Sequence, residues 1–339
     1  EYVRAHDFRR YLHKNLEDFI IETPLENPLD FLNKQFDASL IKDVQTKWIP
    51  YDFKNQNIDD FLENLDIDKT VEISSIQGGY SNAIKQLNKF IEVGYQDYAK
   101  YRSDPSKEAS SQLSPYFHSG QISTHEVFDK ISELESWSPE SINPKMVGRR
   151  EGWWGSSENF ESFMDELITW RELGYHTCVR RANYNQYSSL PEWAIKTLHE
   201  HSSDEREHIY SLDELTYSQT HDEIWNAAQN QLRTQGVIQN YLRMLWGKKI
   251  LEWTPNPQIA LSYMITLNDR YSLDGRDPNS YSGVFWILGR YDRAWGPERS
   301  IFGKIRYMTS DSTARKFNLK PYLEKWGNES LGVSTSISK

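Results

Sequence analysis

The chain has 339 residues, of which 37% are hydrophobic and 14% aromatic, enough for a sizeable core with rings left over for a pocket. No run of about 18 apolar residues occurs, which excludes a predicted transmembrane helix, and the single cysteine, Cys178, excludes an internal disulfide and favours a cytoplasmic location. The net charge of −10 argues against uniform nucleic-acid binding, but residues 240–327 carry 14 Lys and Arg against 8 Asp and Glu, so this third can offer phosphates a basic surface.

The N-terminal part of the chain predicts one helix followed by irregular structure. Apolar residues have helical spacing over 1–20, whereas 21–75 mixes Pro, Asn and Asp with short apolar runs, which indicates loops and short helices. A clear amphipathic helix is predicted over roughly 81–102, after a cap at Ser81. Residues 138–157 contain several Pro and Gly and predict a further irregular stretch.

The helical pattern becomes strong from residue 158 onward. Helices are predicted over 158–180 and 192–201, the second with Pro191 at its first turn. No strand series and no internal repeat is present, so the sequence predicts an all-α fold.

The C-terminal third continues this helical pattern. Thr220–Glu223 has the spacing of a capping box and opens a helical stretch that is broken near Gly236 and ends near Trp253. Another helix is predicted over 257–268, and residues 271–281 are rich in turn formers. The Ser- and Gly-rich tail is predicted to be disordered.

Two residue groups have the composition of ligand sites. His199, Glu200 and His201 form the one tight group of potential metal ligands, and neither HExxH nor CxxC occurs, so the sequence predicts no metal site. The hydroxyls of Ser110, Ser111 and Ser114 precede a predicted helix start, where hydroxyl and N–H groups can hold a pyrophosphate. Such serine clusters are also typical of ordinary loops and caps.

Arg243, Trp246 and Trp253 share one face of a predicted helix. Tryptophans at this spacing are usually core residues. An arginine on the same face, if buried, needs a carboxylate partner, and Asp274 or Asp277 could supply it.

Glu166 and Trp170 form an i, i+4 pair on the predicted helix 158–180. In a pocket, the carboxylate could accept a hydrogen bond from a base while the ring stacks on that base. The alternative is an amphipathic helix with an acid on its surface.

Several segments together resemble the class II cyclobutane-pyrimidine-dimer DNA photolyases. These segments are THDEIWNAAQ (220–229), LRMLWGKKILEW (242–253), LNDRYSLDGRDPNSY (267–281) and FGKIRYM (302–308). A fifth segment, LSPYFHSGQIS (113–123), resembles the flavin-binding entry shared by photolyases and cryptochromes. The resemblance is strong over about 81–326 and weaker over 1–80.

The resemblance implies a photolyase-type FAD-binding helical domain with a loop-rich lead-in. Residues 1–80 would be a linker with short helices, 81–327 the helical catalytic domain and 328–339 a disordered tail. The family's α/β antenna domain has no counterpart here. Because Glu1 is not Met, we expect the sequence to begin inside a longer protein.

The resemblance also implies a bound FAD, active in its reduced form, with an antenna pigment that the sequence does not identify. Arg243 and Asp274 would form a salt bridge against the flavin ring, and Asn268 would face flavin N5. The other implied cofactor-binding residues are Tyr98, Arg102, Ser110, Ser111, Gln112, Leu113, Ser114, Arg171, Asn240 and Gly275.

Further roles follow from the same resemblance. Trp246, Trp225 and Trp253 match an electron-transfer chain that would run from the surface to the flavin, with Tyr210 near this route. Glu166, Trp170 and Trp286 match the pocket for the dimer, in which the two tryptophans would flank the damaged bases. Arg293, Trp295 and Arg306 match positions that hold bent DNA.

The implied activity is light-driven repair of pyrimidine dimers in UV-damaged DNA by a cytoplasmic monomer with no membrane partner. The alternatives are a cryptochrome-like photoreceptor, repair of the (6-4) photoproduct, and a flavin-free helical DNA-binding module. Gln239 and Gly247 depart from the family pattern, in which His and Ala are expected, and Trp153 and Trp154 have no implied role.

Overall fold

The computed structural model describes residues 2, 4–21, 24–25, 27, 38–48 and 57–327. Within these residues the structure is helical, and the β-pairing is limited to two isolated bridges, Arg4–Tyr291 and Arg299–Gly303. The predicted all-α class is therefore confirmed for the described part of the chain. The predicted disordered tail lies outside the described residues.

The chain divides into two compact units. The smaller comprises Glu22–Glu72 and contains α3 (Ala38–Lys47) and α4 (Ile58–Glu63), whose apolar Ile41, Val44 and Ile58 are exposed. The larger combines Glu1–Ile21 with Ile73–Lys339. The first helices therefore pack within the larger unit, and the division of the chain into domains at residue 80 stays a prediction.

These first helices are α1 (Ala5–Asn15) and α2 (Glu17–Ile21). α1 buries Phe8, Arg9 and His13 and packs against a π-helix, Asp165–Trp170. The His13 ring stacks on Trp153 with centroids 3.9 Å apart. Trp153 and the neighbouring Trp154 are both buried in one aromatic core, so these two tryptophans are packing residues.

The predicted helix 81–102 is a nearly continuous helical segment. It starts at α5 (Tyr80–Lys89) and passes through a π-helix (Phe90–Gly94) and a 3-10 turn to α6 (Tyr98–Tyr101). Its N-cap is Gly79, with φ of 98°, and not Ser81. A side chain at Gly94 would place its Cβ 2.7 Å from the Glu108 carbonyl oxygen, so glycine allows the following loop to lie directly on the helix.

The central segment confirms the strong helix predicted over 158–180. It consists of α9 (Glu158–Met164), the π-helix Asp165–Trp170 and α10 (Arg171–Arg180). It is preceded by α7 (Ser114–His118) and α8 (Thr124–Leu134). The stretch 138–157 contains only two 3-10 turns, as its Pro and Gly content predicts.

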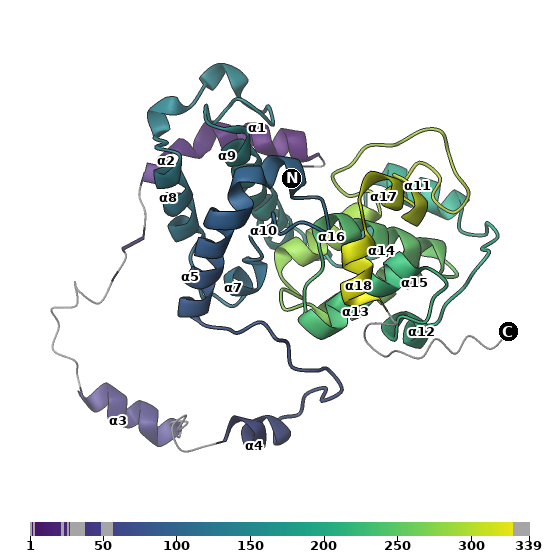
Figure 1. Cartoon of the computed structure of the whole chain (residues 1–339), viewed down its shortest axis with the longest axis horizontal. Helices are drawn as coiled ribbons and strands as arrows, with labels where there is room; N and C mark the ends of the chain where they lie inside the picture. Colours follow the sequence, from purple (N-terminus) through teal and green to yellow (C-terminus); the bar gives the residue numbers. More distant parts are fainter. Residues whose placement is uncertain are drawn as a thin grey trace. The chain divides into compact units, whose positions relative to one another are not determined.

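The C-terminal segment contributes the remaining helices, which are α11 (Glu192–Glu200), α12 (Leu212–Thr216), α13 (Glu223–Gln235), α14 (Asn240–Glu252), α15 (Pro257–Tyr271), α16 (Pro278–Ile287), α17 (Ser310–Lys316) and α18 (Lys320–Trp326). α14 is central in this group, because it packs against α13, α15 and α16 (Figure 1). α16 also packs against α10, which joins the two halves of the larger unit.

Two local predictions require correction. α13 begins at Glu223 with Asp222 as its cap, because the Asp222 carboxylate accepts from the Trp225 N–H. Thr220 instead donates its hydroxyl to the Asn226 amide, so the predicted capping box is wrong. Pro191 occupies the N-cap position of α11 and not its first turn.

Candidate functional site

A half-buried ion pair lies where α14 meets the turn before α16. The Arg243 Nη2 and Asp274 Oδ1 atoms are 3.6 Å apart, and Arg243 also donates to the Asn268 side-chain oxygen at 3.2 Å. The sequence left Asp274 and Asp277 as alternative partners. Asp277 instead caps α16 by accepting from the Asn279 N–H, so the structure selects Asp274.

Asp274 is held as an anion by its neighbours. Burial raises the pKa of this carboxyl, but Arg243 and the hydroxyls of Ser272 and Ser114 outweigh burial, so the net pKa is lowered. Gly275 permits the turn, because a Cβ there would lie 2.9 Å from the Ser272 carbonyl oxygen. Ser114 contacts Asp274, so the serine loop, which comprises residues 110–114, lies beside the ion pair.

Asn268, on α15, is 3% exposed, and its amide orientation is fixed from both ends. Its oxygen accepts from Arg243, and its NH₂ donates to the Ser280 hydroxyl at 3.1 Å. Such a held amide can present a constant dipole to a ligand without adding a charge.

The serine loop reaches this site in a specific backbone conformation. Gln112 has a φ of 54°, Leu113 is fully buried, and the Ser111 carbonyl accepts from Gln86 at 2.9 Å. Ser110 and Ser111 are half-buried, and Ser114 is exposed. Partly exposed hydroxyls beside a half-buried Arg–Asp pair suit a diphosphate and a polar ring system, so the donor set fits a flavin dinucleotide.

Two predicted cofactor residues lie in other surroundings. Asn240 is exposed at the first turn of α14. Arg171 is half-buried and bonds to Glu172 at 3.0 Å and to the Tyr175 hydroxyl at 3.3 Å. Their contacts with a cofactor remain predictions.

Glu166 projects from the π-helix and is bound by an arginine. The Arg102 Nη1 and Glu166 Oε1 atoms are 2.5 Å apart, and the Arg102 guanidinium also lies over the buried Tyr98 ring. Burial raises the pKa of Glu166, and Arg102 lowers it only in part, so the net pKa is raised. The sequence did not predict this pair, since the two residues are 64 positions apart.

Gln239 connects this pair to α14. Its amide donates to the Arg102 carbonyl oxygen at 2.7 Å, while its oxygen accepts from the first N–H groups of α14. Gln239, Arg243 and Trp246 therefore follow one another along α14. The start of the helix is tied to the Arg102–Glu166 pair, and Trp246 lies further along it.

The Trp170 and Trp286 rings are in contact, with centroids 4.4 Å apart at 44°. They form one aromatic wall where α10 packs on α16, and not two walls facing each other across a gap. The pocket expected between Glu166 and the Arg243–Asp274 pair stays a prediction.

Trp246, Trp225 and Trp253 form a series in which Trp225 contacts the backbone of Trp246 and the ring of Trp253. The Trp225 indole N–H donates to the Trp246 carbonyl at 3.0 Å, and the Trp225 and Trp253 rings are 5.7 Å apart. All three are at most 2% exposed, so the series does not end at the surface as expected. Trp253 contacts the rings of Tyr210 at 5.4 Å and of exposed His221 at 5.2 Å, which extend the series outward.

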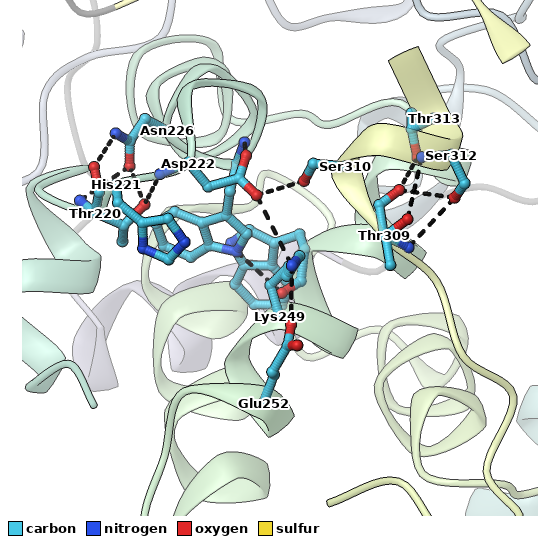
Figure 2. A network of polar contacts seen from close by, with 12 residues as sticks. Thr220, His221, Asp222, Asn226, Lys249, Glu252, Thr309, Ser310, Ser312 and Thr313 are labelled. Carbon is cyan, nitrogen blue, oxygen red and sulfur yellow. Dashed lines mark hydrogen bonds and ion pairs between the residues drawn. The ribbon is translucent and has the colours of Figure 1, made fainter. Parts of the chain in front are cut away.

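A charged network covers the outer part of this series. The Lys249 ammonium lies 4.0 Å from Asp222 Oδ2 and 2.9 Å from Glu252 Oε2, and the Ser310 hydroxyl donates to the same Asp222 oxygen (Figure 2). The Lys249 ammonium also lies 5.3 Å from the Trp253 ring centre. A cavity of about 400 Å³ opens beside these residues and His221. None of His221, Lys249 and Glu252 was singled out from the sequence, because charged residues at helix ends usually have solvated, structural roles.

Arg293 and Arg306 are exposed and lie on the Trp295 ring, at 4.6 Å and 5.1 Å from its centre. The Trp295 indole N–H donates to Asp292 at 3.1 Å, which fixes the ring. The structure therefore brings together the three residues predicted to hold DNA, with the two arginines on the half-buried Trp295 ring.

α14 carries two further residues that tie it to α16. Lys248 is 3% exposed and donates to the Ile287 carbonyl oxygen. A Cβ on Gly247 would lie 2.1 Å from Ile287 Cδ1, which explains why glycine stands where alanine was expected.

No group of three or more potential metal ligands gathers within the described part of the chain. His201, from the one tight group in the sequence, bonds to Asp204 at 2.7 Å. No helix described in the structure is long and apolar enough to cross a bilayer.

Comparisons with known proteins give two kinds of match. The chain is 40% identical over 267 residues to a deoxyribodipyrimidine photo-lyase of Methanothermobacter thermautotrophicus, covering 79% of this chain and 55% of that protein. It is 35% identical over 329 residues to a deoxyribodipyrimidine photo-lyase of Arabidopsis thaliana, covering 94% of this chain and 59% of that protein. No family model matches the chain.

Among solved structures, the chain is similar to a class III photolyase from Agrobacterium tumefaciens, with a TM-score of 0.56 and 16% identity. That match covers 80% of this chain and 50% of the other, and at this identity it shows the fold alone. The chain thus spans little more than half the length of the proteins it matches.

Proposed function

We propose that this chain belongs to the photolyase and cryptochrome family and is the FAD-binding catalytic region of a class II enzyme that repairs cyclobutane pyrimidine dimers in UV-damaged DNA with light. The activity is that of a carbon–carbon lyase, in keeping with the name of the relatives, deoxyribodipyrimidine photo-lyase. The protein acts as a cytoplasmic monomer in this proposal.

One arrangement carries the proposal. α14 places Arg243, with its partner Asp274, one turn from Trp246, and Gln239 ties the start of the same helix to the Arg102–Glu166 pair. The electron relay, through Trp246, and the base-binding carboxylate of Glu166, through Arg102 and Gln239, are thus both connected to α14. Arg243 lies between these two connections along the helix.

The cofactor would be held by residues from three segments. Ser110, Ser111 and Ser114, with Tyr98 and Arg102, would bind the diphosphate and ribityl chain, next to Gln112 and Leu113. Arg243, Asp274, Asn268 and Gly275 would lie against the flavin ring, with Arg171 and Asn240 nearby. When bound and fully reduced, FAD supplies the photoexcited electron for the reaction.

The protein residues orient the substrate and control charge. Glu166 accepts a hydrogen bond from the flipped bases, and its pairing with Arg102 keeps an acceptor oxygen aimed at them. Trp170 and Trp286 give the dimer an apolar surface, which also excludes water. Trp246, Trp225 and Trp253 return electrons to a cofactor that has lost one.

DNA is bound by the basic third of the chain. Arg293 and Arg306 contact phosphates, and Trp295 fills the space that the flipped dimer leaves. Extrusion of the dimer costs a few kcal/mol, least where damage has already weakened the pairing.

Illumination of the reduced, flavin-loaded chain with a dimer-containing oligonucleotide tests the proposal. We expect the thymine absorbance to recover in the light and not in the dark. A purified chain that holds flavin but leaves the absorbance unchanged would instead be a light sensor. A chain that binds DNA and no flavin would be a helical DNA-binding module.

A further inference from the structure

A buried ion pair connects the N-terminal helix to the segment that carries Glu166. The Arg9 guanidinium donates two hydrogen bonds to the Asp165 carboxylate, each of 2.9 Å, across 156 positions of sequence. The side chains are only 9% and 8% exposed. This two-point geometry fixes both groups more firmly than a surface ion pair does.

Asp165 has a second contact, with Trp170. Its Oδ2 atom accepts the indole N–H of Trp170 at 3.2 Å, and the Arg9 guanidinium lies 5.8 Å from the centre of the Trp170 ring. Asp165, Glu166 and Trp170 all belong to one π-helix, a conformation that is frequent at functional sites. Trp170 has χ freedom of its own, so its ring orientation depends on these contacts and on Trp286.

We propose that Arg9 and Asp165 are positioning residues for the substrate pocket, which set the orientation of Trp170 and thereby the preference for DNA that contains a dimer. This inference rests on the proposed function. It assigns the first helix, which the sequence placed in a lead-in linker, a part in substrate recognition.

The energetics favour a positioning role over a purely stabilising one. Desolvation of two charges cancels much of their attraction, so an apolar pair of similar volume often gives equal or greater stability. Removal of one partner alone leaves a buried charge without compensation and is strongly destabilising. A double substitution therefore separates positioning from stability.

The experiment measures dissociation constants of the flavin-loaded chain in the dark, for a duplex with one thymine dimer and for the same duplex undamaged. In Arg9→Met/Asp165→Leu, we expect dimer binding to weaken about tenfold, since a held aromatic contact is lost, while undamaged DNA binds within about twofold of wild type. Arg9→Lys keeps the charge without the two-point geometry. Its dissociation constant for the dimer duplex is expected to lie between those of wild type and the double variant.

His13→Phe is the matched control, because His13 is buried on the same helix but stacks on Trp153, and burial lowers its pKa to about 4, so the substitution removes no charge beside Arg9 and Asp165 at neutral pH. It should lower the melting temperature without changing the ratio of the two dissociation constants. An unchanged ratio in the double variant overturns the inference, and if that variant does not fold, an unchanged ratio in Arg9→Lys does so. A wild-type chain with no preference for the dimer duplex overturns the proposed function itself, so the two failures are distinguishable.

Discussion

Lys248 shows how much a single buried side chain can depend on its surroundings. It lies in α14, and its direct acceptor is the neutral carbonyl of Ile287 at the end of α16. Burial lowers the pKa of this ammonium to about 7, with Asp292 raising it and Arg306 lowering it further. The residue therefore links two helices that carry site residues, at a cost that varies with pH.

The contribution of Lys248 to stability depends on pH. Since the folded pKa lies below the ordinary value of 10.5, the folded chain binds fewer protons between pH 7 and 10.5 than the unfolded chain, and the free energy of unfolding rises with pH in this window. Lys248→Met removes the ionisable group and with it this pH dependence. The free energy of unfolding of the variant minus that of wild type should therefore fall by about 2 kcal/mol from pH 7 to pH 9. Urea denaturation at both pH values measures this difference. Lys196→Met, at an exposed lysine of α11, is the control, and a difference that stays constant with pH would contradict the prediction.

Glu166 is the residue whose role depends most on its environment. Its side chain is 32% exposed and its carboxyl is paired with Arg102, while burial raises the pKa of that carboxyl. Glu166→Ala should reduce the repair yield about tenfold, the effect of losing one charge-assisted hydrogen bond, while flavin stays bound by the separate Arg243–Asp274 and serine groups. Repair yield and flavin absorbance are measured on the same sample. Repair at the wild-type yield would remove Glu166 from the proposed mechanism.

At the scale of elements, α14 and α16 approach so closely that only glycine fits at position 247. The Cβ of an alanine would overlap Ile287 and crowd Met264, whose sulfur would be 3.0 Å away. Gly247→Ala should lower the free energy of unfolding by about 1–3 kcal/mol, as overpacking does. Gly283→Ala on α16 meets nothing within 4 Å and should be neutral or stabilise by up to about 1 kcal/mol, because alanine favours helix. Thermal melts of both variants decide, and equal stability of the two would contradict the close packing.

The aromatic series that joins α13 to the end of α14 gives a second prediction at this scale. Trp225→Phe replaces the indole that contacts Trp246 and Trp253 with a phenyl ring, which is much harder to oxidise, and removes one hydrogen bond worth about 1 kcal/mol. We expect photoreduction of bound oxidised flavin to slow severely, while repair by chemically reduced flavin is unchanged. Trp137→Phe is matched, because it also removes an indole hydrogen bond to a carbonyl, at 2.7 Å, but in the aromatic core that contains Trp153 and Trp154. Equal photoreduction rates in the two variants would show that the series is only packing.

At the scale of the whole molecule, charge is divided along the chain. The sequence carries −10 overall, yet 14 Lys and Arg against 8 Asp and Glu lie in residues 240–327. An acidic remainder opposes nonspecific binding, so DNA is expected to approach only through the basic third.

Salt dependence tests this division. Arg293→Ala and Arg306→Ala should each weaken DNA binding and reduce the slope of log K against log salt by about 1, since each arginine would release a counterion from a phosphate. Lys130→Ala, at an exposed lysine of α8, is expected to leave the slope unchanged. Slopes that respond equally to all three substitutions would place DNA elsewhere on the molecule.

The sequence by itself determined the helical class and most helix positions. The predicted segments 81–102 and 158–180 are helical, and the break at Gly236 is a left-handed C-cap with φ of 77°. These features depend on residues within one or two turns, where apolar spacing and caps act. Helical spacing also placed Arg243 on the same face as Trp246 and Trp253, and from this the need for a carboxylate partner follows.

Only the tertiary structure decided which distant groups meet. It selected Asp274 over Asp277, paired Arg102 with Glu166, and brought Arg9 of the first helix to Asp165. It also placed the outermost tryptophan of the series below the surface. The physical reason is that a polar side chain accepts any partner of suitable charge, so its choice is made by the packing of whole helices and not by the local sequence.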